Sequence, residues 1–485
     1  MNTPLSSSQP GSGVIPAPVP VSEIRASCRL PLLVLFISAA VWLVIASVFA
    51  LIASVKFHSP SFLADSPWLT YGRVHPAYMN SFLYGFCVQA ALGLTLWLFA
   101  WIGQTRIAQS WLVFAGAKLW NLGVTIGIIG ILAGDSTGFE GLEIPGYAAI
   151  ILFLAYLMIG VWAAVTFHFR NERRLVPSQW FLLAALFWFP WIYSTANLLL
   201  TTFPVRGISQ AVIGWWYLAN FQTVWLGLVG LAALFYFVPK FAGRPMHSHY
   251  LSLFTFWTLL LLGGWTGIPN SAPVPAWIPT LSTIATALMV VPLIAIALNV
   301  YATAGGVVPR QSTHRSLVFF MTGVTAFLIA GLMKILTALT GLTKFTWFIP
   351  GTAQLVLYGF FAFIVFGAVY YIVPEVIGLD LASPKMVRAN FWLSLSGLIL
   401  LVLPEIVGGL LQGLKMQNPN TPFTEIMKSS LHFLRVSTLG ELLILAGNLV
   451  FVCNLGGLVV RLYRARATAA YSAVTAEIQP AKLTP

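Results

Sequence analysis

The stretch FQTVWLGLVGLAALFYFVPKF, Phe221 to Phe241, decides what kind of fold this chain adopts. No charged residue occurs between Arg206 and Lys240. The hydrocarbon core of a bilayer is about 30 Å thick, and a helix needs about 20 mainly apolar residues to cross it. This stretch meets that requirement and shows no alternation of apolar and polar residues, so it predicts a transmembrane helix and not a strand of a membrane barrel.

The composition extends this interpretation to the whole chain of 485 residues. Hydrophobic residues make up 59% and charged residues only 8%, which is typical of a polytopic membrane protein and far from the quarter or so of charged residues in soluble domains. The net charge of +13 comes from short basic clusters between apolar runs, so nucleic-acid binding is not expected. The three cysteines are far apart in the sequence and predict neither a disulfide framework nor a thiolate metal site.

Twelve apolar runs are long enough to cross a membrane, and we predict an all-α polytopic membrane protein with twelve transmembrane helices. The runs lie at 31–55, 78–103, 111–133, 147–169, 179–201, 211–238, 250–268, 278–302, 316–339, 351–374, 389–411 and 437–461. We see no convincing internal repeat, so one membrane domain at 29–463 is the simplest arrangement.

The two ends of the chain are predicted to be cytoplasmic tails. Residues 1–28 are rich in Pro, Ser and Gly, which predicts disorder, and residues 464–485 form a second tail. With twelve crossings both tails lie on one side, and that side receives sixteen of the 25 Lys and Arg residues, against seven on the other. This bias predicts a bacterial cytoplasmic membrane protein with both termini in the cytoplasm.

Four stretches resemble a known family. They are TYGRVHPAYMNSFLYGF (70–86), WWYLANFQTVWLGLVGLAALFYFVPKFAGRP (215–245), LSLFTFWTLLLLGGWTGIPN (251–270) and FTWFIPGTAQLVLYGFFAFIVFGAVYYIVPEVIG (345–378). Together they are similar to subunit I of the heme–copper oxygen reductases, in particular the cbb3-type cytochrome c oxidases. The resemblance runs from the second to the tenth span and continues more weakly into the twelfth.

The resemblance implies a specific set of imidazole ligands. In the family, a low-spin heme is held by histidines of the second and tenth spans, and a high-spin heme by a histidine of the tenth. A copper ion is held by one histidine of the sixth span and an adjacent pair in the seventh. Imidazole suits both metals, and amide or apolar side chains do not readily substitute for it.

The matching positions of this chain carry no histidine. They are Tyr78 in the second span, Ala219 in the sixth, Pro269 and Asn270 in the seventh, and Thr352 and Gln354 in the tenth. Gly263 stands where cbb3-type oxidases have a tyrosine cross-linked to a copper ligand. No histidine occurs at 169–246, 250–313 or 315–431. We therefore expect a degenerate member of the family, with no copper and no heme and no catalytic residues.

The remaining polar residues leave alternatives open. A heme b held by Tyr78 and Gln354, with His75 at its rim, is the alternative to a cofactor-free chain, and Tyr78, Phe82 and Tyr358 are candidate fillers of the core. Glu143 resembles an acidic residue of the family's outer loop. Four ionisable residues fall within predicted spans and are functional candidates because their burial in hydrocarbon is costly. They are Lys118, Lys334, Glu405 and Glu441. Lys334 resembles a family lysine in a proton-delivery region, and we expect it to pair with a carboxylate or a carbonyl.

Three functions remain open. The first is a cofactor-free structural or regulatory subunit of a respiratory complex, in contact with membrane lipid and with other subunits such as c-type cytochromes. The second is a cytochrome c or quinol oxidase subunit that binds heme through unconventional ligands. The third is a proton or small-solute pathway through the core, in which Lys334 takes part. The family would make the chain an oxidase subunit, whereas the missing ligands argue against oxygen reduction by this chain.

Overall fold

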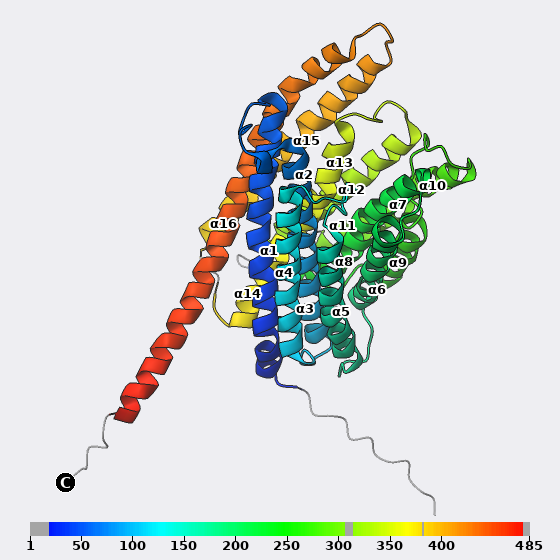
Figure 1. Cartoon of the computed structure of the whole chain (residues 1–485). Helices are drawn as coiled ribbons and strands as arrows, with labels where there is room; N and C mark the ends of the chain where they lie inside the picture. Colours follow the sequence, from blue (N-terminus) through cyan, green and yellow to red (C-terminus); the bar gives the residue numbers. More distant parts are fainter. Residues whose placement is uncertain (1–18, 306–313, 381–382, 479–485) are drawn as a thin grey trace, which may run out of the picture.

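The computed structural model describes residues 19–305, 314–380 and 383–478, which fold into one bundle of long helices (Figure 1). The first six spans are formed by α1 (Val21–His58), α2–η2–α3 (Tyr71–Asn80, Ser81–Val88, Gln89–Ile102), α4 (Ser110–Ala133), α5 (Gly146–His168), α6–η3 (Pro177–Asn197, Leu198–Thr202) and α7–η4–α8 (Ile208–Ala219, Asn220–Trp225, Leu226–Ala242). A short 3₁₀ turn, η1 (Pro67–Leu69), precedes α2.

The second half of the chain continues in the same way. Its helices are α9 (His249–Gly263), α10 and α11 (Trp277–Leu288, Val290–Ala304), α12 (His314–Leu339), α13–η5–α14 (Phe348–Gln354, Leu355–Ala362, Phe363–Ile377), α15 (Pro384–Met416) and α16 (Phe423–Ile478). We call the end of the bundle where α1 begins the N-terminal face, and the opposite end the distal face.

Each of the twelve predicted runs forms helix, but the seventh is shorter than expected. Within the described residues, eleven helical segments are long and apolar enough to cross a membrane. The predicted span 250–268 is instead the 15-residue helix α9, which ends at Gly263. At 1.5 Å per residue α9 reaches only about 22 Å, and residues 264–276 continue as a loop. The predicted boundary at 268 was wrong because the run Gly263–Gly264 ends the helix early.

Local sequence signals explain where several helices begin and end. Ser248 and Ser383 each cap a helix by accepting a hydrogen bond from a backbone amide in the first turn, and Pro384 follows at the first position of α15. At the other ends, Gly134 and Gly378 adopt left-handed backbone conformations just after α4 and α14.

The predicted tails are partly helical. Helix α1 begins at Val21, inside the segment 1–28 that was predicted to be disordered, and α16 continues to Ile478, inside the predicted tail 464–485. Residues 1–18 and 479–485 lie outside the described part of the chain. Helices α15 and α16 extend beyond the rest of the bundle at the distal face, and the last turns of α16 extend away from it at the other end (Figure 1).

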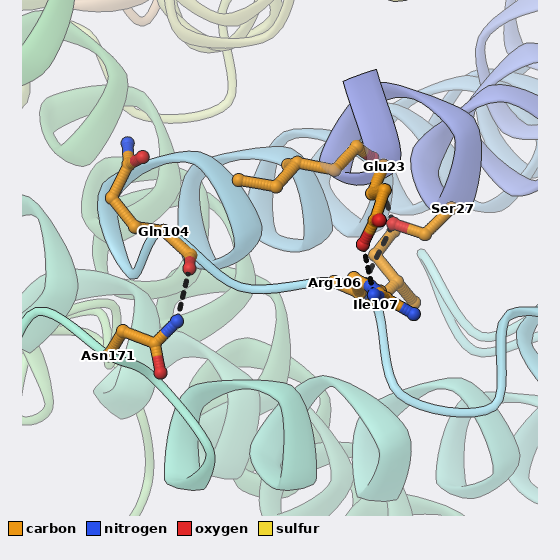
Figure 2. A network of polar contacts seen from close by, with 7 residues as sticks. Glu23, Ser27, Gln104, Arg106, Ile107 and Asn171 are labelled. Atoms are coloured by element: carbon orange, nitrogen blue, oxygen red, sulfur yellow. Dashed lines mark hydrogen bonds and ion pairs between the residues drawn. The ribbon is translucent and has the colours of Figure 1, made fainter. Parts of the chain in front are cut away.

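Polar contacts hold the loops of the N-terminal face together (Figure 2). Arg106 forms an ion pair with Glu23 of α1, and the backbone amide of Ile107 donates to the Ser27 hydroxyl at 3.1 Å. The Asn171 side chain of the next loop donates to the carbonyl of Gln104 at 2.9 Å. The first two contacts fix the start of α1 against the α3–α4 connection, and the third joins that connection to the one between α5 and α6.

Three helical segments form the interior of the bundle. The most apolar stretch of 18 residues is 89% to 94% buried in α2–η2–α3, α7–η4–α8 and α13–η5–α14. In the other eight spans the corresponding stretch is only 39% to 50% buried. The latter face the bundle on one side only, as expected of helices that meet lipid. The three inner segments are also the second, sixth and tenth spans, on which the expected cofactor positions lie.

Candidate functional site

Each of the three inner segments contains a stretch of π-helix beside an expected ligand position. The stretches are η2, which begins three residues after Tyr78, η4, which begins directly after Ala219, and η5, which begins directly after Gln354. π-Helix accounts for well under 1% of residues in proteins and occurs frequently at functional sites. The backbone of this chain is therefore irregular at the three places where the family resemblance puts ligands.

Two of these π-helical stretches contain the same four-residue sequence, which is too short to stand out as an internal repeat. The tetrapeptide LYGF occurs at 83–86 and again at 357–360, and each π-helical stretch is eight residues long and begins two residues before it. Alignment of the two tetrapeptides also places Tyr78 opposite Thr352. The second and tenth spans are therefore related in local structure as well as in sequence.

The side chains at two ligand positions touch each other directly. The amide nitrogen Nε2 of Gln354 donates a hydrogen bond to the Tyr78 hydroxyl, with 2.6 Å between the two atoms. Metal–nitrogen and metal–oxygen bonds to first-row ions are about 2 Å long, so two axial donors on opposite sides of an iron atom stand about 4 Å apart. Tyr78 and Gln354, as they lie, do not fit an iron atom between them.

Aromatic rings fill the space around this hydrogen bond. The ring of Phe82 lies between those of Tyr78 and Tyr358, with 6.4 Å between centroids on each side, and 5.3 Å from that of Phe86. Phe82 and Tyr358 are 3% and 2% exposed. The Tyr358 hydroxyl donates to Asn448 at 2.7 Å. The three predicted filler residues thus belong to one packed cluster, which we call the Tyr78 cluster (Tyr78, Phe82, Tyr358, Gln354).

The expected copper positions lie at the end of α7 and in the loop after α9. Ala219 lies against Gly267, whose backbone has a left-handed φ of 104°; a Cβ added to Gly267 would lie 2.2 Å from that of Ala219. Pro269 and Asn270 belong to the loop after α9 and not to a transmembrane helix. Asn270 is exposed, donates to the carbonyl of Ala338 at 3.1 Å and accepts from Thr283.

The two other positions of the expected site are similarly unsuited to a metal. Thr352 is buried and its hydroxyl donates to the carbonyl of Phe348 in the same helix at 2.9 Å. Gly263 ends α9 and packs against Val224. Among the described residues, no three His, Cys, Asp or Glu side chains come together in a way that could hold a metal ion.

His75 continues an aromatic stripe along α2. Its ring lies 5.4 Å from that of Tyr71 and 6.0 Å from that of Tyr78, one helical turn away on either side. His58, at the end of α1, lies 3.1 Å from the Thr438 hydroxyl and so links α1 to α16. His75 thus lies beside one candidate heme ligand, Tyr78, whereas the contact of His58 is a threonine hydroxyl.

The two lysines within the spans lie in opposite environments. Lys118 is exposed on the outside of α4, with its ammonium 5.6 Å from the ring of Phe114. Lys334 points into the bundle, where its Nζ donates to the hydroxyl of Thr223 in η4 at 3.1 Å. The partner of Lys334 is a hydroxyl and not the predicted carboxylate or carbonyl.

The two predicted intramembrane carboxylates, Glu405 and Glu441, are both buried, at 8% and 7% exposure. They lie within electrostatic range of each other and of Tyr78. The Oε2 atom of Glu405 faces Gly351 and has no hydrogen-bond partner among the described residues. Both carboxylates therefore lie beside the Tyr78 cluster, as sequence position alone did not indicate.

A loop at the distal face closes over the second span. Glu143, in the loop 134–145, is buried and accepts a hydrogen bond from Nδ2 of Asn80 at 2.7 Å. The Tyr84 hydroxyl donates to the carbonyl of Gly141 at 2.6 Å and lies 2.7 Å from that of Tyr217. Burial raises the pKa of Glu143 to about 7, and the Asn80 hydrogen bond opposes only part of this shift.

Comparison with known proteins identifies the family of this membrane protein. Residues 31–443 match the description of the family "Cytochrome C and Quinol oxidase polypeptide I", so the chain belongs to this family. It is 24% identical over 439 residues to a cytochrome c oxidase subunit 1 homolog of Azorhizobium caulinodans, a match that covers 86% of this chain and 79% of that protein.

Other relatives agree with this assignment. The Cbb3-type cytochrome c oxidase subunit CcoN1 of Stutzerimonas stutzeri is 23% identical over 436 residues, which cover 86% of this chain and 92% of that protein. A cryo-EM structure of a heme-copper terminal oxidase dimer superposes with a TM-score of 0.64 at 14% identity and covers 87% of this chain and 83% of that one. The predicted fold class is thus confirmed.

Proposed function

We propose that this chain is a cofactor-free relative of oxidase subunit I that serves as a structural or regulatory subunit of a respiratory membrane complex. The observation that carries the proposal is the 2.6 Å hydrogen bond between Tyr78 and Gln354. Two family ligand positions satisfy each other there, and aromatic rings pack around them. A chain that bound heme at this place would need two donors about 4 Å apart and room for a porphyrin.

The proposal includes an orientation and partners. The charge distribution favours both termini in the cytoplasm of a bacterial cell, with the distal face outside. The partners we propose are other respiratory subunits, such as c-type cytochromes or an intact subunit I, because the chain belongs to a family of oxidase subunits. The chain would contribute contact surfaces to the assembly and not electron transfer.

Pyridine-hemochrome analysis of the purified full-length chain, together with iron and copper analysis, tests the proposal. We expect less than one tenth of an equivalent of each metal and no low-spin b-type bands in the reduced-minus-oxidised spectrum. An intact cbb3-type subunit I, produced and purified in the same cells, is the positive control for heme supply. Near-stoichiometric heme would contradict the proposal, and its loss in the variants Tyr78→Phe and Gln354→Leu would establish the unconventional ligation.

A further inference from the structure

A small cavity lies between the sixth and tenth spans and their outer neighbours. Its volume is about 40 Å³, and its walls come from η4, the loop after α9, α10, α11, α12, η5 and Met289 between α10 and α11. Its polar wall includes Gln222, Thr223 and Lys334, and its apolar wall includes Met289, Leu293 and Phe327. Neither the oxidase family's missing ligands nor the proposed function accounts for this cavity.

Hydrogen-bond donors without acceptors point into the cavity. The Lys334 ammonium uses one of its hydrogens on Thr223, at 3.1 Å. The hydroxyl of Thr223 accepts this bond and has no acceptor for its own proton among the described residues. The side chain of Gln222 is only 7% exposed and makes no hydrogen bond in the described part of the chain. These three side chains therefore offer an ammonium, an amide and a hydroxyl to one small space.

No carboxylate neutralises the lysine. The described residues contain two ion pairs, Arg25–Glu375 and Arg106–Glu23, and Lys334 belongs to neither. A charged group inside a membrane bundle is costly unless an opposite charge or several hydrogen bonds compensate it. Thr266 and Thr286, which also line the cavity, already donate to the backbone carbonyls of Gly263 and Ser282. The remaining need of the site is for a negative charge that accepts hydrogen bonds.

We propose that this cavity binds one small monovalent inorganic anion of about the size of chloride, held by Lys334, Gln222 and Thr223. A single water molecule needs roughly 10–15 Å³ in a measure of this kind, so 40 Å³ suffices for one such anion with one or two waters. The apolar walls favour a weakly hydrated anion and exclude a large organic one. This inference goes beyond the proposed function and does not depend on it.

Radioactive chloride binding to the purified full-length protein tests the proposal. We would hold the ionic strength constant with sodium gluconate and use bromide as the competitor. We expect saturable binding of about one chloride per chain, displaced by bromide. Lys334→Met should weaken the binding roughly tenfold or more, because it removes the charge and a charge-assisted hydrogen bond. Gln222→Leu should weaken it about threefold to tenfold, and Lys334→Arg should retain it.

Lys118→Met is the matched control, because Lys118 is the other lysine within the spans and is exposed on the outside of the bundle. We expect it to leave chloride binding within twofold of the original protein. Absence of saturable chloride binding to the original protein would overturn the proposal. Chloride binding by both Lys334→Met and Gln222→Leu that is as tight as that of the original protein would also overturn it, as would a loss in Lys118→Met as large as that in Lys334→Met. Elution as a single species is the criterion for folding. If Lys334→Met does not meet it, chloride binding by the Gln222→Leu protein decides between the outcomes. Heme content does not enter this measurement, so the two proposals can fail separately.

Discussion

The Tyr78 cluster, between the second and tenth spans, and the Lys334 cavity, which the sixth and tenth spans help to line, differ in how their polar groups are satisfied. At the Tyr78 cluster, the amide of Gln354 and the hydroxyl of Tyr78 pair with each other, and Phe82 and Tyr358 pack around them. At the cavity, Gln222 pairs with no described residue and Lys334 has only a hydroxyl as partner. The Tyr78–Gln354 pair is thus satisfied within the protein, although Oε2 of Glu405 beside it has no described partner, whereas the cavity leaves an ammonium and an amide in need of acceptors.

The two sides show two ways in which the space between the inner helices of an oxidase-type bundle is occupied. A bundle interior is close-packed, so any space has to be filled by side chains or by bound molecules. Large rings do this on the side of the second and tenth spans. On the side of the sixth and ninth spans, the approach of Gly267 to Ala219 fills only part of the space. Three measurements test this comparison.

The largest effect is expected from Phe82→Ala. Loss of this buried ring should reduce the free energy of unfolding by about 3–5 kcal/mol, because a cavity replaces a ring that contacts Tyr78 and Tyr358. Met289→Ala, in the apolar wall of the existing cavity, should cost about 2 kcal/mol, since its neighbours are already less tightly packed. Unfolding in mixed detergent micelles would measure both. A smaller loss of unfolding free energy for Phe82→Ala than for Met289→Ala would contradict tighter packing around Phe82 than around the cavity.

An intermediate effect is expected from pH, at the distal end of the Tyr78 side. The pKa of Glu143 is raised from 4.5 to about 7 by burial, so the folded protein binds more protons than the unfolded chain between these two values. Stability should therefore be fully present below about pH 4.5 and fall as the pH rises to about 7, by up to about 3 kcal/mol in total.

Hydrogen exchange of the loop 134–145 at several pH values would measure this effect. We expect protection of the loop to decrease from pH 5 to pH 8. Glu143→Gln keeps an acceptor for Asn80 and should remove the pH dependence, whereas Asp65→Asn, at an exposed position in another loop, should leave it unchanged. Unaltered pH dependence in Glu143→Gln would show that another group is responsible.

The smallest effect separates the hydrogen bonds of the two sides. Tyr78→Phe should cost about 1–2 kcal/mol, because it leaves the Gln354 amide without its partner in a packed core. Thr223→Val should cost less than about 1 kcal/mol, because the cavity has room for water or an anion to accept from the Lys334 ammonium in place of the hydroxyl. A double-mutant cycle of Tyr78→Phe with Gln354→Leu should give a coupling energy of about 1 kcal/mol. Equal losses of unfolding free energy in Tyr78→Phe and Thr223→Val would show that the two hydrogen bonds are equally important for stability.

The sequence predicted the fold class well, because the requirement for about 20 apolar residues per crossing is visible in any single chain. It placed all twelve apolar runs, and it placed α9 wrongly only at its end. The absence of histidine from the sixth, seventh and tenth spans also needed no structure, since an inventory does not depend on register. The placement of Pro269 and Asn270 in the seventh span did depend on where that helix ends, and the two residues lie in the loop after it.

Other features could not be predicted from one sequence. The π-helical stretches depend on how the inner helices pack, although the repeated LYGF tetrapeptide gave a signal for two of them. The position of Glu405 and Glu441 beside Tyr78 depends on which faces of α15 and α16 meet the inner helices. The pairing of Lys334 with Thr223 joins residues 111 positions apart in the sequence. Contacts of this kind follow from helix packing and not from hydropathy.

The sequence by itself determined that this protein is a helical membrane bundle of the oxidase subunit I family and that its sixth, seventh and tenth spans contain no imidazole. These properties follow from composition and order, which the bilayer and metal chemistry constrain directly. Only the tertiary structure decided that Tyr78 bonds to Gln354 within a packed cluster while Lys334 and Gln222 point into a cavity. Such contacts join side chains of helices distant in sequence, and the arrangement of those helices sets their distances.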